Sequence, residues 1–101
     1  MLFANKIKQL REERGLLQRQ LAATLEIDTP MYSKIERGDR RAKREQVVII
    51  PKLLQIDEKE LLTLWLADQV AAVVANDKDI ADKALKIAQQ TVKQQSVSNK
   101  D

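Results

Sequence analysis

The sequence predicts an all-α fold, and three observations support this. Glycine and proline, which interrupt helices, occur only twice each among the 101 residues. Leu, Ala, Lys, Gln and Glu, which are favourable in helices, make up much of the chain. Apolar residues recur three and four positions apart along most of the chain, which is the spacing of an amphipathic helix. A chain of this length fits one domain with at most a short appended element.

The first three predicted helices span about 2–14, 18–25 and 29–37. Gly15 and Gly38 follow the first and the third, as expected of residues that end a helix in the left-handed conformation. Asp28 is the predicted N-cap of the third helix, because its carboxylate can accept hydrogen bonds from the free N–H groups of the first turn. Pro30 lies within that turn, where its missing N–H costs nothing.

The fourth predicted helix, about 44–55, contains Pro51. Proline inside a helix removes a backbone hydrogen bond and costs about 3 kcal/mol, so we expect a kink or a break near 47–50. The β-branched run Val47–Ile50 leaves a short strand as an alternative, although no neighbouring segment offers a pairing strand. Asp57 is expected to cap a fifth helix over about 58–75, and a sixth begins near Asp77 or Asp79.

The fifth predicted helix is apolar on two sides, whereas a surface helix of a monomer has one apolar stripe. Two apolar sides indicate two partners, which are the domain core and either another helix or a second subunit. Trp65 could anchor the core or the subunit interface. The sixth helix could pack within its own subunit or across a dimer. The residues predicted to mediate dimerisation are Leu62, Trp65, Leu66, Val70 and Val73.

Residues 15–38, GLLQRQLAATLEIDTPMYSKIERG, form the most informative stretch of the chain. They predict two short helices at a steep angle, with the small Ala22 where the helices approach and Ile27 filling the turn. Tyr32 and Ile35 anchor the second of these helices in the core. Its opposite side then faces outward, and a helix presented in this way can enter the major groove of DNA.

With these residues the chain resembles the lambda-repressor-like helix-turn-helix family of the xenobiotic-response-element type, which includes phage repressors and restriction–modification controller proteins. The resemblance covers about residues 3–62, through the stretches IKQLREERGLLQRQLA, MYSKIERGDR and LLQIDEKEL. It implies a compact five-helix DNA-binding domain, which we place at 1–66. A C-terminal helical extension that carries dimerisation would follow at 67–95, and a disordered tail at 96–101.

The resemblance implies roles for individual residues. Gln18 matches a glutamine that contacts a phosphate, while Arg11 and Glu36 match a structural pair that joins the first helix to the third. Lys34 could donate hydrogen bonds to guanine, and Met31 could pack on a thymine methyl group. The positions that match the recognition helix are Thr29, Pro30, Met31, Ser33 and Lys34, and those that match the phosphate-binding loop are Arg37, Arg40 and Arg41.

Three positions depart from the family pattern in ways that bear on stability or recognition. Leu17 replaces the usual threonine cap of the second helix, which weakens that cap by about 1 kcal/mol. Glu26 replaces the usual glycine of the turn, so a left-handed conformation there would cost about 1–2 kcal/mol. Pro30 and Met31 are poor hydrogen-bonding residues, so DNA shape and the arginine loop are expected to supply part of the specificity.

Charge is distributed unevenly along the chain. Residues 1–44 carry 11 basic and 6 acidic side chains, whereas residues 45–101 carry 7 and 9, and the net charge is +3. A basic N-terminal half is consistent with an end that meets a polyanion, and a random variation in surface charge is the alternative.

Other function classes lack the residues they need. The chain contains no cysteine and no histidine, which removes disulfides, thiol chemistry and the usual zinc ligands. It also lacks a nucleophile elbow and a glycine-rich phosphate loop, so we expect no enzyme activity, no cofactor and no metal. No apolar run approaches the length of a membrane span, about 20 residues, and no signal peptide is recognisable. We therefore expect a cytoplasmic protein without a membrane partner.

The sequence thus predicts a homodimeric regulator of transcription that binds double-stranded DNA in a sequence-specific manner, acts as a repressor and controls its own gene. One domain reads only a few base pairs, so affinity requires a second copy. An alternative is an antitoxin-like interaction module whose C-terminal helices mask a protein partner and which also binds DNA. A further alternative is a degenerate helix-turn-helix domain that binds no DNA.

Overall fold

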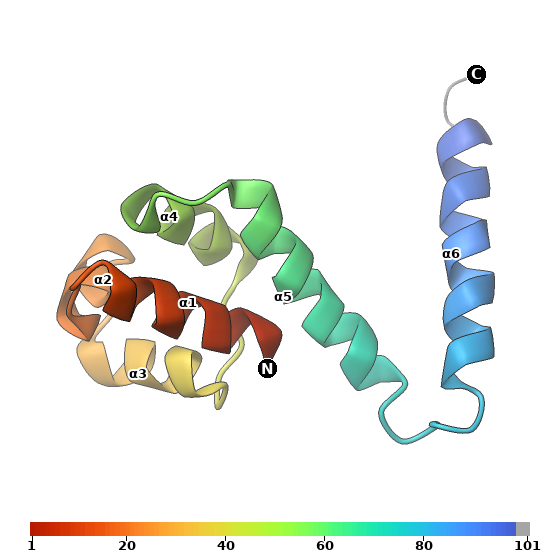
Figure 1. Ribbon diagram of the computed structural model, residues 1–101, viewed down its shortest axis with the longest axis horizontal. Coiled ribbons are helices and arrows are strands. Elements are labelled where there is room, and N and C mark those ends of the chain that lie inside the picture. The colour runs from red at the N-terminus through yellow and green to blue at the C-terminus, as the bar shows by residue number, and fades with distance from the viewer. Residues whose placement is uncertain (99–101) are drawn as a thin grey trace. The chain divides into compact units, whose positions relative to one another are not determined.

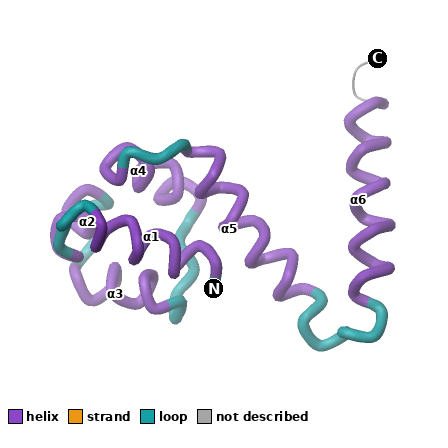
Figure 2. The backbone as a smooth tube through the Cα atoms, in the orientation of Figure 1, coloured by secondary structure: helices purple, strands orange, loops and turns teal. Residues whose placement is uncertain are grey.

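The computed structural model describes the backbone of residues 1–98, which form six helices and no strand (Figures 1 and 2). The all-α prediction is therefore confirmed. The chain divides into two compact units, Met1–Gln69 and Val70–Asp101. The helices are α1 (Leu2–Glu13), α2 (Gln18–Thr24), α3 (Thr29–Arg37), α4 (Arg44–Leu54), α5 (Glu58–Val73) and α6 (Ala81–Ser98).

The first unit has one hydrophobic core, formed by the inward faces of α1 to α4 and the start of α5. Helix α3 contacts both α1 and α2, and α4 contacts the same two helices. The apolar positions that the sequence assigns to the inside of these helices are buried. The largest fully buried side chains are Ile7, Leu21, Tyr32, Ile35, Val47, Ile50, Leu54 and Leu61.

Helices α1 to α4 all end in the same way, with one residue in the left-handed conformation. These residues are Gly15 (φ 65°), Glu26 (φ 58°), Gly38 (φ 83°) and Gln55 (φ 55°). In each case the N–H of the residue that follows donates to the carbonyl five positions earlier, which defines a Schellman motif. The donor and acceptor pairs are Leu16 to Arg11, Ile27 to Ala22, Asp39 to Lys34, and Ile56 to Pro51.

The turn between α2 and α3 contains the strain that the sequence predicts. Glu26 has a φ of 58°, a conformation that an L residue with a side chain adopts only at a cost. The next residue, Ile27, donates its N–H to the Ala22 carbonyl at 3.0 Å and packs against the core. Packing of Ile27 thus holds the turn in a shape that Glu26 itself does not favour.

Side chains close by in the sequence cap the N-termini of α2, α3 and α4 in two different ways. Asp28 caps α3 as predicted, because its Oδ1 accepts a hydrogen bond from the Met31 N–H at 2.7 Å. Leu17 cannot cap α2, but its own N–H donates to the Gln20 side-chain carbonyl at 2.7 Å. The Gln46 side chain accepts from the Lys43 N–H at the start of α4 in the same manner, at 2.8 Å. Each glutamine provides one half of a capping box and offsets part of the missing cap.

Helix α4 continues through Pro51, so the alternative of a strand is wrong, and of the expected kink or break the break does not occur. Pro51 lies in the last turn of the helix, where its carbonyl accepts the Ile56 N–H of the Schellman motif at 3.1 Å. Val47, Ile50 and Leu54 are all fully buried around it. Their burial outweighs the loss of one backbone hydrogen bond.

Helix α5 extends the first unit further than the predicted boundary at residue 66. The carboxylate of Asp68 accepts hydrogen bonds from the N–H groups of Leu2 and Phe3, at 2.9 and 3.0 Å. It therefore caps the N-terminus of α1 from a distant part of the chain. Trp65 belongs to the same unit, since its Nε1 donates to the Ala42 carbonyl at 2.8 Å and the Arg44 guanidinium lies 5.7 Å from its ring centroid. Trp65 is thus an anchor within its own domain.

Helix α6 differs from the sequence-based expectation at both ends. It begins at Ala81, after two turns, and not at Asp77 or Asp79. It continues through residues 96–98, which are the first three residues of the predicted tail, and 99–101 lie outside the described chain. None of the side chains described in α6 is buried. Over residues 1–98, no helix is both long and apolar enough to cross a membrane.

Replacing Glu26 with glycine should stabilise the protein by about 1 kcal/mol, because glycine relieves the left-handed strain and loses only part of this gain to unfolded-chain entropy. Urea unfolding followed by circular dichroism measures the difference. Glu26→Ala is the matched control and should give no such gain, since alanine keeps the strained side chain. A glycine variant no more stable than the wild type would contradict this prediction.

Candidate nucleic-acid interface

Helices α2 and α3 bury one side and expose the other. Leu21 and Ala22 of α2, and Tyr32 and Ile35 of α3, point into the core. Along the opposite side of α3, Thr29, Pro30 and Lys34 are exposed, and Met31 and Ser33 are half-buried. The five positions assigned to a recognition helix thus lie on accessible parts of one helix.

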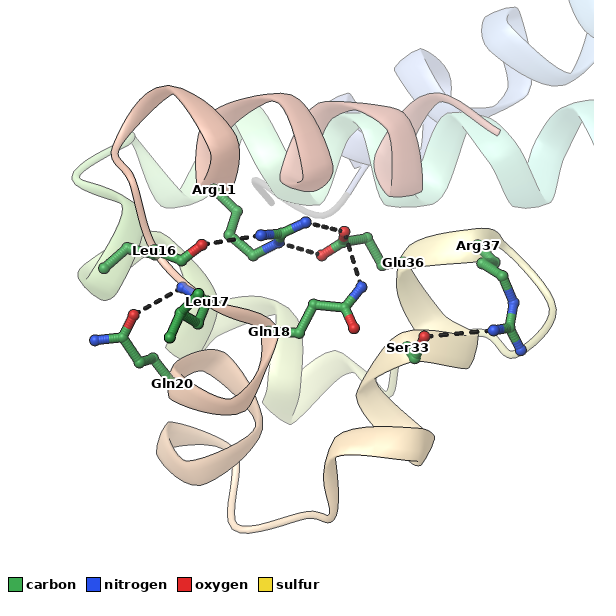
Figure 3. Close-up of polar contacts among 8 residues, drawn as sticks. All are labelled: Arg11, Leu16, Leu17, Gln18, Gln20, Ser33, Glu36 and Arg37. Atoms are coloured by element: carbon green, nitrogen blue, oxygen red, sulfur yellow. Dashed lines mark hydrogen bonds and ion pairs between the residues drawn. The ribbon is translucent and has the colours of Figure 1, made fainter.

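A buried polar network fixes α3 relative to α1 and α2 (Figure 3). The Arg11 guanidinium donates from Nε and Nη2 to the two oxygens of the Glu36 carboxylate, at 2.9 and 2.8 Å. Arg11 Nη1 donates to the Leu16 carbonyl at 2.9 Å, and Gln18 Nε2 donates to Glu36 Oε1 at 3.2 Å. Only 12% of the Arg11 side chain and 2% of the Glu36 side chain are exposed. The network therefore ties three helices together at a point shielded from solvent.

The ionisation of Glu36 depends on these contacts. Burial alone would raise its pKa, but the hydrogen bonds from Arg11 and Gln18 hold the pKa below its ordinary value. The nearby Tyr32 hydroxyl lowers the pKa of Glu36 further, although it does not form a hydrogen bond with the carboxylate. The stabilisation from Glu36 is therefore complete above the ordinary carboxyl value of 4.5 and is lost as the pH falls through the lower folded-state pKa.

Tyr32 belongs to the core and does not reach the outward face. Its side chain is fully buried, and its hydroxyl has no hydrogen-bond partner among the described residues. Burial, with the Glu36 carboxylate beside it, raises the pKa of Tyr32 far above the physiological range. Tyr32 is thus a neutral phenol next to the ion pair.

Gln18 stands at the start of α2, where the resemblance places a phosphate contact. One of its amide N–H groups is engaged with Glu36. The amide has a second N–H and a carbonyl oxygen, which are not needed for that bond. The contact with Glu36 thus orients the Gln18 amide without using all of its hydrogen-bonding capacity.

The basic residues around α3 differ in how they are neutralised. Arg37 Nε pairs with Asp39 Oδ2 at 3.0 Å, and Arg37 Nη1 donates to Ser33 Oγ at 3.4 Å. In the described part of the chain, Lys34, Arg40 and Arg41 form no ion pair. Their charges are therefore available to a ligand. The bond from Arg37 to Ser33 and the pairing with Asp39 were not predicted, although Asp39 lies only two positions from Arg37.

The exposed recognition face, its unpaired cations and the buried network define a helix-turn-helix DNA-binding domain. The family model described as helix-turn-helix matches residues 7–61, which is more than half of the chain. The chain belongs to this family, in its lambda-repressor-like, Cro/C1-type form, as the sequence predicts. Comparisons with curated proteins and with solved structures gave no match.

Family membership defines the general function. The chain is a DNA-binding regulator of transcription, and double-stranded DNA is its ligand. The family consists of DNA-binding regulatory domains and is not a family of enzymes.

Proposed function

We propose that this protein is a dimeric, sequence-specific repressor that controls its own gene. The observation that carries the proposal is the outward side of α3, which presents polar and apolar groups between unpaired cations. Repression requires only that the protein occupy the operator, and the resemblance to phage repressors supports this mode of action. The DNA immediately upstream of the protein's own gene is the first operator to test.

In the proposed complex α3 lies in the major groove of B-DNA. Lys34 is exposed and carries no intramolecular ion pair, so its ammonium can donate to the O6 and N7 acceptors of guanine. Met31 can contact a thymine methyl group. Arg40 and Arg41 follow the helix on an exposed loop and can bind phosphates on one side of the groove.

Direct reading of bases by this face is limited. Pro30 has no donor on its side chain, and the Ser33 hydroxyl already accepts a hydrogen bond from Arg37. Thr29 and Lys34 are exposed on α3 and form no side-chain hydrogen bond with a described residue, whereas the exposed Arg37 is engaged with Asp39 and Ser33. The specificity of the protein should therefore depend in part on the shape and deformability of its operator.

The case for a dimer is the unpartnered surface of the second unit. Most of the stability of a helix in a protein comes from packing of its apolar face, yet none of the described side chains of α6 is buried. One side of α6 carries Leu85, Ala88 and Val92, which together with Val70 line an open cavity of about 560 Å³. A second copy that covers this apolar surface would give α6 the packing it lacks.

The acidic residues at the start of this segment are balanced by basic neighbours, because Lys78 lies between Asp77 and Asp79 and Lys86 pairs with Asp82 at 3.1 Å. The apolar side of α6 is therefore the surface that a second copy would cover. A two-fold dimer would then present two α3 helices to half-sites about 34 Å apart, or a multiple of that distance.

The five residues first assigned to the dimer interface do not share one environment. Leu62 and Trp65 pack against the core of their own domain. Leu66, Val70 and Val73 are exposed on α5, and Val73 is 78% exposed. Leu66 belongs to the first unit, whereas Val70, Val73 and α6 belong to the second. We therefore propose that the interface comprises Val70, Val73 and the apolar side of α6. The antitoxin-like alternative uses the same surface, covered by a different protein.

The DNA-binding proposal predicts tight binding to duplex DNA from immediately upstream of the gene, measured by fluorescence anisotropy. Affinity should fall steeply with salt, because cations of the protein displace counterions from phosphates. Replacing Arg40 and Arg41 with glutamine should lower the salt slope by about 0.9 for each phosphate that the variant no longer neutralises. Lys52→Gln, a charge change on the exposed side of α4, is the matched control and should leave the slope unchanged.

A random duplex of equal length separates sequence preference from general affinity. Stronger binding to the upstream duplex supports a repressor that controls its own gene. Equal binding to both duplexes would contradict control of its own gene but not DNA binding. Absence of binding to either duplex at low salt would contradict the DNA-binding proposal as a whole.

The dimer proposal predicts a dimeric mass at micromolar concentration in sedimentation equilibrium. The double substitution Leu85→Gln, Val92→Gln should shift the protein toward monomer, because it places polar groups on the apolar side of α6. Leu85→Met with Val92→Ile keeps that side apolar and should remain dimeric. A monomeric wild-type protein would contradict the proposal. A stable complex with a different protein from the native host would favour the antitoxin-like alternative.

A further inference from the structure

A second polar surface lies beside the recognition helix and involves α1. It is an open cavity of about 430 Å³. Asn5 and Lys8 of α1 line one side, and Gln18 of α2 and Arg37 of α3 line another. Asp39 and the ion pair of Arg11 and Glu36 complete it. The cavity is adjacent to the recognition face, because Arg37 also bonds to Ser33 of that face (Figure 3).

Most of the charged residues that line this cavity neutralise one another. Arg11 is neutralised by Glu36 at 2.8 Å, and Arg37 by Asp39 at 3.0 Å. Lys8 is exposed and makes no ion pair with any described residue. The net positive charge of the cavity therefore comes from Lys8 alone.

The neutral groups around Lys8 are hydrogen-bond donors. Asn5 contributes a side-chain amide, and Gln18 retains the amide N–H that Glu36 does not use. One free ammonium group and two amide donors around an open polar cavity suit an oxyanion of low charge. A phosphate diester of the DNA backbone has this chemistry, and its contacts in protein–DNA complexes come from lysine and amide side chains of this kind.

The family resemblance already implies a phosphate contact at Gln18. We infer that this phosphate lies in the cavity, with Lys8 as its ionic contact and the Asn5 amide as a further neutral donor. The inference rests on the proposed DNA-binding function and adds α1 to the DNA-contacting surface. Arg37 acts here as a positioning residue, because its pairing with Asp39 keeps that carboxylate from repelling the phosphate. Arg11 has the same role toward Glu36.

The test compares two lysines of α1 that differ in their surroundings. Lys8 lines the cavity, whereas Lys6 lies elsewhere on the helix, 3.9 Å from Glu60 and away from this cavity. Lys8→Gln and Lys6→Gln each remove one positive charge, so any long-range effect of net charge is common to both. Affinity for the upstream duplex and for a random duplex is measured as a function of salt.

Lys8→Gln should lower the salt slope by about 0.9 and weaken binding roughly fivefold at 0.15 M salt, by a similar factor on both duplexes. Lys6→Gln should leave the slope unchanged, and Lys8→Arg should retain it. Circular dichroism melting checks that the variants are folded, since Lys8 is exposed and its loss should not unfold the domain.

Two results would overturn the inference. If the wild type binds DNA with a steep salt slope and the two glutamine variants behave alike, then Lys8 makes no phosphate contact and only this inference fails. If the wild type binds neither duplex, the proposed function fails, and this inference fails with it.

Discussion

The buried ion pair between Arg11 and Glu36 is the interaction on which the rest of the structure depends. It joins α1 to α3, and through Gln18 it reaches the start of α2. A charge removed from water in this way requires its partner, because an unpaired buried carboxylate is strongly destabilising. The pair therefore fixes the angle at which α3 is presented. It also neutralises the charges of Arg11 and Glu36, whereas Lys34, Arg40 and Arg41 form no ion pair in the described part of the chain.

The parts of the fold predicted from sequence are those set by local chemistry. Asp28 and Gly38 mark the ends of α3 because capping depends on residues within one turn. The break expected at Pro51 did not occur, since the outcome depended on the burial of residues around it and not on the proline alone. The cap of α1 by Asp68 could not be predicted, because its donor and acceptor are 65 and 66 positions apart.

The candidate site, like the fold, was predicted where local sequence patterns determine it and not where distant segments meet. Apolar spacing identified which side of α3 faces outward, and the family resemblance placed Arg11 opposite Glu36. Spacing alone cannot reveal the contact of Gln18 with Glu36 or the position of Lys8, because both depend on how three helices meet. The sequence also could not show whether Trp65 anchors the core or an interface. Its hydrogen bond to the Ala42 carbonyl makes it an anchor within its own domain.

A double-mutant cycle on the free energy of unfolding tests most directly whether this ion pair holds the motif together. Urea unfolding at neutral pH compares the wild type with Arg11→Met, Glu36→Gln and the double variant. Arg11→Met should cost about 3 kcal/mol because it leaves Glu36 buried without a partner, and the coupling energy should reach about 2 kcal/mol. Costs that add within about 0.5 kcal/mol would show that the two residues act independently and would contradict this account.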